Sequence, residues 1–293
     1  MTFLRKPGSL KNLAMVSSLL ALPTVATAEW GLNLPRGVTP YSRTIYDLHM
    51  LILWICFIVG VVVFGLMFYS IIKFRKSQGA QAAQWHESTK VEVAWTLVPF
   101  VILVAIAVPA TKALIMMEDV SNSDMTIKVT GYQWKWHYQY IDEGLGFFST
   151  LSATSNEARQ RKSGIDPKSV DNYLLEVDNH LIVPINKKIR FLTTAGDVIH
   201  AWWVPALGWK RDAIPGFINE SWAIIEEPGV YRGQCAELCG KDHGFMPIVV
   251  EALPQAEFDA WVEKMQSETQ QAKRAAPTTA TDKALEIADA EAH

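Results

Sequence analysis

The run LILWICFIVGVVVFGLMFYSII, residues 51–72, contains no charged side chain. A helix rises about 1.5 Å per residue, so a run of this length crosses a hydrocarbon core about 30 Å thick. A second uncharged run, VAWTLVPFVILVAIAVPAT, occupies residues 93–111. Pro99 and Pro109 would break a helix in water, but the surroundings of a membrane helix accommodate proline. The two runs predict a transmembrane hairpin, with spans at about 48–73 and 91–115 in a segment covering 29–117.

The connection between the two runs is basic. Lys73, Arg75 and Lys76 follow the first run, and Lys90 precedes the second. Short loops rich in Lys and Arg stay in the cytoplasm, so the chain beyond the second run is expected on the outer side. Residues 1–28 agree with this orientation, because MTFLRKPGSLKNLAMVSSLLALPTVATA has the basic, apolar and small-residue segments of a secretory signal peptide. A retained N-terminal helix is the alternative.

Residues 118–254 differ in texture from the membrane segment. Short runs rich in Val, Ile, Tyr and Trp, such as MTIKVTGYQWKWHYQY, are separated by Gly, Pro, Asn and Asp. This pattern predicts a small β-sandwich or barrel. Residues 144–171 are rich in Gly, Ser, Asn, Lys and Asp, so we expect a long loop or insertion there. Residues 255–293 begin with helical spacing in QAEFDAWVEKMQ and end in a polar tail.

Composition limits the partners of the chain. The formal net charge is −3, which favours neither nucleic acid nor a polycationic partner. Of the three cysteines, Cys56 lies within the first apolar run, where it is expected to act as a small apolar residue. Only Cys235 and Cys239 remain for chemistry outside the membrane.

Both of these cysteines belong to the stretch GQCAELCGKDHGFMPIVV, residues 233–250. A disulfide is one interpretation of their short separation, but it explains neither His243 nor Met246. A thioether is a poor ligand for zinc or calcium and a good one for Cu(I). A mononuclear blue-copper site uses one cysteine, so two thiolates could instead bridge two metal ions. The loop predicts a copper site that needs a second histidine.

His200, in TAGDVIHAWWVP, is the best candidate for that second histidine. Aromatic and apolar neighbours would keep water from a metal there. Taken alone, such a histidine is more often a hydrogen-bonded core or edge residue. His137 and His180 are less attractive, because they lie among polar or exposed β residues with no adjoining ligands.

The segments DVIHAWWVP, DAIPG at 212–216, GQCAELCGKDHGFMPIVV and GYQWKWHYQY resemble subunit II of bacterial cytochrome c oxidase. The resemblance covers roughly residues 30–265. It implies a cupredoxin-like β-barrel domain after the hairpin, on the periplasmic side of the bacterial inner membrane. It also implies that the chain accepts electrons from cytochrome c and passes them to haem in subunit I, for oxygen reduction coupled to proton pumping. Subunit III is a further implied partner.

The resemblance also implies roles for individual residues. The binuclear copper centre CuA would be bound by His200, Cys235, Cys239, His243, Met246 and the backbone carbonyl of Glu237. The Glu237 side chain would bind magnesium together with subunit I. Trp134 matches the aromatic residue that passes electrons from cytochrome c to copper. The alternative for Trp134 is packing beside Trp136 on one face of a strand.

Two further assignments come from the resemblance. Four acidic residues fit the docking surface for cytochrome c, where complementary charge speeds association: Asp142, Glu176, Asp178 and Asp197. Glu92 matches a residue at the mouth of a proton channel, although Thr89 and Glu92 also form a capping-box pattern at a helix start.

Three other functions compete with this interpretation. A quinol oxidase subunit shares the hairpin and barrel but lacks the copper ligands. Nitrous oxide reductase has a similar copper loop but is soluble and needs a much longer chain. A membrane-bound copper carrier explains the loop, but it does not explain Trp134, Glu92 or the DAIPG segment.

Overall fold

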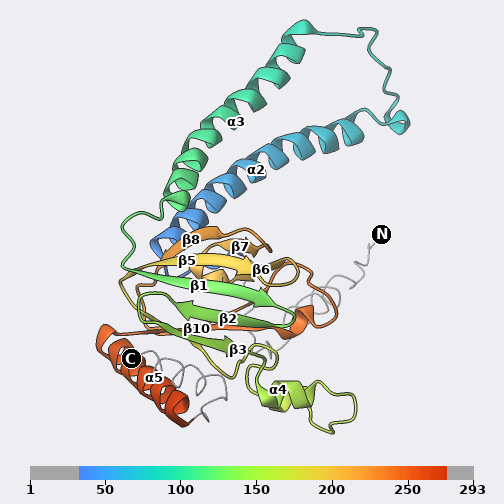
Figure 1. The fold of residues 1–293 in the computed structure, drawn as a ribbon. Coiled ribbons are helices and arrows are strands. Elements are labelled where there is room, and N and C mark those ends of the chain that lie inside the picture. The colour runs from blue at the N-terminus through green and yellow to red at the C-terminus, as the bar shows by residue number, and fades with distance from the viewer. Residues whose placement is uncertain (1–32, 276–293) are drawn as a thin grey trace, which may run out of the picture. The chain divides into compact units, whose positions relative to one another are not determined.

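A computed structural model describes residues 33–275 (Figure 1). The chain divides between Leu34 and Pro35, and every element described below belongs to the unit that begins at Pro35. The predicted signal peptide, residues 1–28, and the polar tail beyond residue 275 lie outside the described residues.

The predicted membrane hairpin is confirmed as two long helices, α2 (Pro40–Lys73) and α3 (Thr89–Glu118), joined through the short helix η1 (Lys76–Gln78). Both helices are long and apolar enough to cross a membrane. Pro99 and Pro109 lie within α3 without ending it. Helix α2 begins earlier than the expected span because Thr39 caps it: the Thr39 hydroxyl accepts a hydrogen bond from the Ser42 amide at 2.9 Å.

The ends of both helices contact the domain that follows. The amide of Val38, just before α2, donates to the carbonyl oxygen of Ala206 at 3.0 Å. Near the end of α3, the Met116 carbonyl oxygen accepts a hydrogen bond from Trp222 Nε1 at 3.1 Å. Arg211 forms an ion pair with Glu118 at 3.0 Å. Both helices are thus joined to the β domain by specific bonds.

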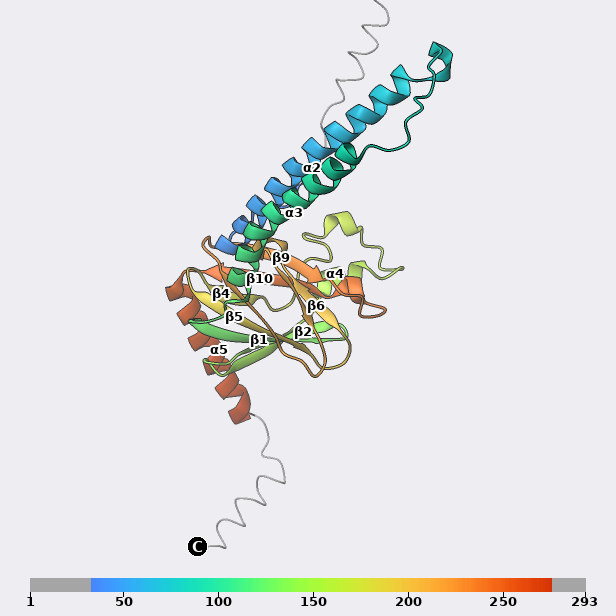
Figure 2. The same cartoon turned by 90° about the horizontal axis from the view of Figure 1, so that it is seen from above.

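That domain consists of two five-stranded sheets, which confirms the predicted β-sandwich or barrel (Figures 1 and 2). Most neighbouring strands are antiparallel, but β1 pairs with β5, and β4 with β10, in parallel. The first sheet has the order β3 (Leu145–Ser149), β2 (Lys135–Tyr140), β1 (Met125–Tyr132), β5 (Lys188–Ala195) and β8 (Asn219–Ile224). The second has the order β4 (Leu181–Pro184), β10 (Pro247–Leu253), β9 (Gly229–Cys235), β6 (His200–Trp203) and β7 (Lys210–Ala213).

Alternating side chains of these strands form the core. Strand β5 buries every second residue, as expected for a strand with one face on the core. Phe191 on β5 stacks on Trp202 of β6 at 5.3 Å between ring centroids, and Trp209 packs on both rings. Helix α5 (Gln255–Ala275) adds Phe258, which is buried, to the same core.

The segment 144–171 differs from the expected loop. It contains strand β3 at the edge of the first sheet, the short helix α4 (Ala153–Ala158) and the short helix η2 (Pro167–Ser169). Strand β3 pairs with β2 from Trp136 to Tyr140, so the first part of the segment belongs to the sheet. The polar composition of residues 144–171 did not predict this strand. An edge strand can bury only one face, so half of its side chains can be polar.

Candidate metal centre

Sheet pairing brings the two parts of the predicted copper site together. Strand β6 runs antiparallel to β9, and Trp202 lies opposite Cys235. His200 and Trp202 share a face of β6, since side chains alternate along a strand. The ring nitrogen Nδ1 of His200 therefore lies 3.9 Å from Sγ of Cys235, although the two residues are 35 positions apart.

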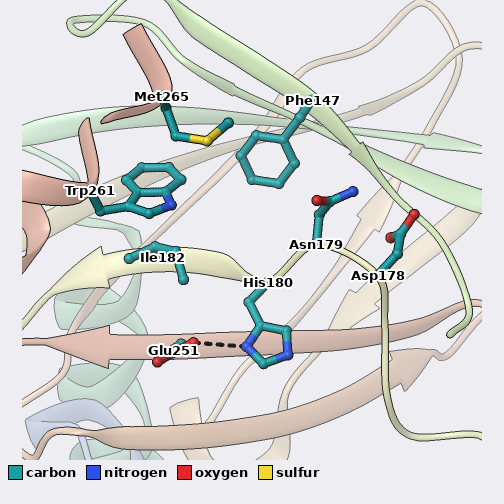
Figure 3. A pocket seen from close by; sticks show the side chains of 8 residues that line it. All are labelled: Phe147, Asp178, Asn179, His180, Ile182, Glu251, Trp261 and Met265. Carbon is teal, nitrogen blue, oxygen red and sulfur yellow. Dashed lines mark hydrogen bonds and ion pairs between the residues drawn. The ribbon is translucent and has the colours of Figure 1, made fainter. Parts of the chain in front are cut away.

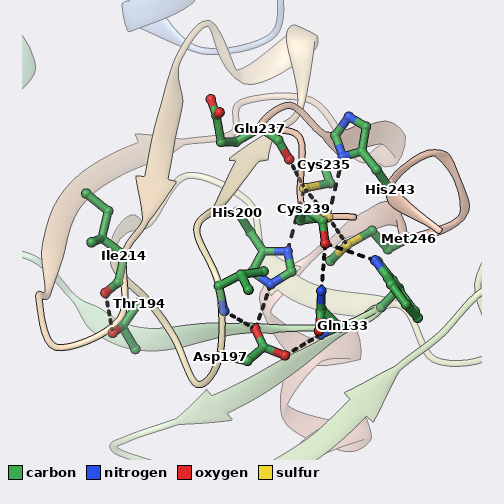
Figure 4. Close-up of polar contacts among 12 residues, drawn as sticks. Gln133, Thr194, Asp197, His200, Ile214, Cys235, Glu237, Cys239, His243 and Met246 are labelled. Carbon is green, nitrogen blue, oxygen red and sulfur yellow. Dashed lines mark hydrogen bonds and ion pairs between the residues drawn. The ribbon is translucent and has the colours of Figure 1, made fainter. Parts of the chain in front are cut away.

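The loop after β9 supplies the other donor atoms (Figure 4). The two cysteine sulfurs lie 3.8 Å apart, and both cysteines are free, so the alternative disulfide is not formed. Sγ of Cys239 lies 3.5 Å from His243 Nδ1 and 3.5 Å from Met246 Sδ. Sγ of Cys235 lies 3.4 Å from the backbone oxygen of Glu237. The two sulfurs therefore form the centre of the cluster, and each has one histidine beside it.

The cluster is shielded from water. His200, Cys235, Cys239 and Met246 are buried, and the side chain of His200 is fully enclosed. His243, on the short helix η4 (His243–Phe245), is half-buried. Gly131 on β1 makes room for the histidine ring, because a Cβ at this position would lie 2.8 Å from Cδ2 of His200.

The electrostatics of the two thiols differ. Burial alone would raise the pKa of Cys235, but hydrogen bonds from His200 and from backbone amides outweigh it and lower that pKa. Burial, together with the neighbouring Cys235 thiolate, raises the pKa of Cys239. Two thiolates this close repel each other unless positive charge lies between them. A bound cation deprotonates coordinating thiols, so the pair is suited to share metal ions.

The donor atoms fit a soft transition metal. The ligand atoms of His200, Cys235 and Cys239 all lie within 4.8 Å of one another. Thiolate, thioether and imidazole groups select such metals, whereas magnesium and calcium prefer oxygen ligands. The residues present could therefore hold a metal.

Asp197 has a role that the sequence interpretation missed. Its Oδ1 lies 2.9 Å from Nε2 of His200, and its Oδ2 accepts a hydrogen bond from the Gln133 amide at 2.7 Å. Burial alone would lower the pKa of His200, but the bonds to Cys235 and Asp197 outweigh it and raise that pKa. The three-residue spacing of Asp197 and His200 was the only sequence signal for this contact.

Trp134 does not lie in the strand that holds Trp136, contrary to the alternative that both share one strand face, although Trp134 does pack against the core. Trp134 lies in the turn between β1 and β2, and its Nε1 donates to the Cys239 carbonyl oxygen at 3.2 Å. Gln133 donates to the same oxygen at 2.9 Å. Trp136, fully buried in β2, donates to the Met246 carbonyl oxygen at 3.3 Å. Both indoles therefore contact the backbone of the ligand loop.

Glu237 and Glu92 lie apart from the sulfurs. The Glu237 carboxylate is exposed and points away from the cluster, while its backbone carbonyl faces Cys235 (Figure 4). Glu92 lies in the first turn of α3, about 40 Å along the helix axis from Glu118. Its carboxylate accepts a hydrogen bond from the Ser88 amide at 3.3 Å. Ser88, rather than Thr89, is the N-cap residue.

The four acidic residues expected at a docking surface all make contacts within the chain. Glu176 pairs with Arg232 at 2.6 Å and with His180 at 2.8 Å. Asp178 accepts hydrogen bonds from the amide and hydroxyl of Thr150, and Asp142 accepts one from the Thr126 amide. Together with Asp197, these carboxylates therefore have structural partners.

The remaining candidate histidines do not join the sulfur cluster. His180 lines a separate cavity of about 310 Å³ and contacts Glu251 at 2.8 Å (Figure 3). The other side chains around this cavity are Phe147, Asp178, Asn179, Ile182, Trp261 and Met265. His137 packs against Phe148 at 4.7 Å between ring centroids.

Both parts of the chain match models of known protein families. The family model "Cytochrome C oxidase subunit II, periplasmic domain" matches residues 125–253, and "Cytochrome C oxidase subunit II, transmembrane domain" matches residues 27–113. The solved periplasmic domain of subunit II of cytochrome oxidase from Bradyrhizobium japonicum is 43% identical, with a TM-score of 0.43, and the match covers 51% of this chain and 98% of that one.

Whole-chain relatives give the same family. A probable cytochrome c oxidase subunit 2 of Rickettsia felis is 38% identical over 255 residues, covering 86% of this chain and 78% of that protein. Cytochrome c oxidase subunit 2 of Cereibacter sphaeroides is 34% identical over 258 residues, covering 85% of each. The chain therefore belongs to the family of cytochrome c oxidase subunit II, a membrane-anchored part of an oxidoreductase complex.

Proposed function

We propose that this subunit accepts electrons from cytochrome c at a binuclear copper centre, CuA, and passes them to haem in subunit I. In the assembled oxidase this transfer drives oxygen reduction coupled to proton pumping in the bacterial inner membrane. The observation that carries the proposal is the convergence of His200, Cys235, Cys239, His243, Met246 and the Glu237 carbonyl on one buried cluster.

These residues would hold the copper in a fixed environment. The bound centre would supply one-electron transfer with little rearrangement of its ligands. The paired strands β6 and β9 fix His200 against Cys235. Burial of the sulfurs excludes water, and the Asp197 carboxylate holds the His200 ring with Nδ1 toward the cluster.

Trp134 is the proposed point where electrons arrive from cytochrome c. Its indole is half-buried, so part of the ring is accessible to a partner. The Trp134 N–H donates to the Cys239 carbonyl, so a single hydrogen bond joins the ring to the backbone of a cysteine in the cluster. The acidic residues Asp142, Glu176, Asp178 and Asp197 would attract a basic cytochrome despite their internal contacts.

The ligand loop carries an exposed apolar side chain that a partner subunit would cover. Leu238, which follows Glu237, is 78% exposed, and Phe217 and Ile218 before β8 are exposed as well. The neighbouring Glu237 carboxylate points outward, which suits a magnesium ion shared with subunit I. Subunit III is proposed as a further partner in the complex.

Glu92 is proposed to lie at the mouth of a proton channel. It is exposed at the start of α3, on the side of the basic connection that the sequence places in the cytoplasm. An ionisable group at the end of a membrane helix is well placed to take up protons. Its hydrogen bond with Ser88 is compatible with this role, because one carboxylate oxygen suffices for that bond.

Electron paramagnetic resonance of the purified oxidase tests the proposal. We expect hyperfine structure from two equivalent copper nuclei in the wild type. Cys235→Ser should remove it, whereas the matched control Cys56→Ser, in α2, should leave it unchanged. A single-copper signal contradicts the proposal. A folded, metal-free protein with a Cys235–Cys239 disulfide also contradicts it and favours a copper carrier or a structural loop.

A further inference from the structure

The two histidines of the cluster are supported unequally. His200 is fully buried on a strand, and Asp197 binds its second ring nitrogen. His243 is half-buried on the single turn of η4, and its Nδ1 faces Cys239. Among the described residues, nothing forms a hydrogen bond with Nε2 of His243. The position of His243 must therefore depend on what holds η4 itself.

One side chain outside the loop contacts both ends of η4. Arg159, from the segment between β3 and β4, forms an ion pair between Nη1 and Oδ1 of Asp242 at 3.2 Å. The same guanidinium lies over the ring of Phe245, 4.3 Å from its centroid. Asp242 immediately precedes His243, and Phe245 immediately precedes Met246. Arg159 thus holds the residues that adjoin two of the proposed ligands.

Arg159 is itself held in place. Its Nε donates to Asn156 Oδ1 at 2.7 Å, so the guanidinium contacts three residues: Asn156, Asp242 and Phe245. Helix α4, which Arg159 follows, is anchored through the buried Ser155, whose hydroxyl accepts a hydrogen bond from the Leu174 amide at 3.2 Å. The contacts are about one-fifth exposed, with side-chain exposures of 22% for Arg159 and 17% for Asp242. A partly buried ion pair in a fixed geometry is stronger than an exposed one.

A hollow beside η4 would allow this short helix to shift if the contacts of Arg159 were lost. A hollow of about 180 Å³ is lined by Trp134, Asn156, Arg159, Asp242 and Phe245, together with two residues that follow β3. If the guanidinium were removed, the side chains of Asp242 and Phe245 would have room to shift. The short helix has no side-chain cap of its own to resist that shift.

We propose that Arg159 is a positioning residue for the His243 half of the metal centre. The inference rests on the proposed copper function and assigns a purpose to the α4 segment. Arg159 acts through Asp242 and Phe245. Its charge pairs with the Asp242 carboxylate, and its planar guanidinium packs over the Phe245 ring. Lysine would keep the charge but could not reproduce the stacked, forked geometry.

The test compares Arg159→Gln with Arg161→Gln in the purified oxidase. Arg161 is exposed on the same segment, so its substitution removes the same charge without removing these contacts. We measure the rate at which the reduced enzyme loses copper to a Cu(I) chelator, and the nitrogen hyperfine couplings by pulsed electron paramagnetic resonance. Arg159→Gln should speed copper loss about fivefold to thirtyfold, the equivalent of one partly buried ion pair and one cation–π contact.

The spectroscopic signature separates positioning from general destabilisation. In Arg159→Gln one nitrogen coupling, that of His243, should shift while the coupling of His200 stays unchanged. Arg159→Lys should recover part of the copper retention. Should Arg159→Gln fail to assemble, Asp242→Asn serves instead, because it removes the ion pair and leaves the ring contact; it should give a smaller increase in copper loss.

Failure of the inference is distinct from failure of the proposed function. If the wild type lacks the signal of two copper nuclei, the copper proposal is wrong. If the wild type has it and the Arg159 and Asp242 variants release copper at the wild-type rate with both couplings unchanged, the positioning role is wrong. An equal effect of Arg161→Gln would also overturn it, since charge alone would then explain the result.

Discussion

The carboxylate of Asp197 lies 2.9 Å from Nε2 of His200, while Nδ1 of the same ring faces the Cys235 sulfur at 3.9 Å. An acceptor on Nε2 favours keeping the proton of the neutral ring on that nitrogen, so that Nδ1, which now faces the Cys235 sulfur, would be the nitrogen to bind a metal. Asp197 therefore stabilises the ring in the orientation that ligation requires.

Replacing Asp197 with alanine should weaken copper binding about tenfold to a hundredfold, because outer-shell partners of ligating histidines have effects of this size. The measurement is copper retention in the oxidase against a graded series of chelators. Asp171→Ala, at an exposed carboxylate elsewhere in the domain, is the control. Equal retention in wild type and Asp197→Ala would show that the carboxylate does not support the ligand.

Trp134→Ala should slow reduction of the copper centre by cytochrome c at least tenfold, since it removes both the accessible ring and the bond to the Cys239 carbonyl. Trp134→Phe keeps a ring but not the N–H donor, so an intermediate rate would measure the contribution of that bond. Stopped-flow reduction is the measurement. The copper spectrum must stay intact, and Trp261→Phe, on α5, is the control. Unchanged kinetics in Trp134→Ala would exclude Trp134 as the electron path.

Glu92→Gln should reduce oxidase turnover more than tenfold if Glu92 takes up protons. The amide oxygen of glutamine can still accept the bond from Ser88, so the start of α3 is preserved and only the ionisable group is lost. Oxygen consumption by the purified complex is the measurement. Glu87→Gln, in the exposed connection before α3, should behave as wild type. Normal turnover in Glu92→Gln would leave helix capping as the role of this residue.

Glu176 should make stability depend on pH. Burial alone would raise its pKa, but the bonds from Arg232 and His180 outweigh it and lower that pKa below its usual range. A lowered folded-state pKa means that the stabilisation is complete above the unfolded-state pKa and is lost as the pH falls through the folded-state pKa. Glu176→Gln should therefore lower the free energy of unfolding by about 1 kcal/mol at pH 7.

That difference between Glu176→Gln and wild type should begin to shrink as the pH falls below the ordinary glutamate pKa, and it should disappear once the pH falls through the lowered folded-state pKa, where the wild-type carboxylate is protonated too. Thermal unfolding of the chain in detergent, followed by near-ultraviolet circular dichroism between pH 3 and 7, gives both curves. Asp171→Asn is the control, and a difference that stays constant with pH would exclude the ion pair as its source.

Several features could be predicted from the sequence because they depend on local pattern. The hairpin follows from two uncharged runs, and Pro99 and Pro109 did not interrupt α3. The donor types of the ligand loop follow from residues that lie within a dozen positions of one another. Short runs rich in Val, Ile, Tyr and Trp, separated by turn residues, predicted the β domain, although the division of residues 125–140 into β1 and β2, with Trp134 in the turn, was not apparent.

Only the tertiary structure decided which distant segments of the chain come into contact. The sequence by itself determined that a membrane hairpin precedes a β domain, and that one loop carries cysteine, histidine and methionine. The pairing of β6 with β9 decided that His200 meets Cys235, and the return of the β3–β4 segment decided that Arg159 meets η4. Strand register and side-chain packing act through space, so residue spacing along the chain does not encode them directly.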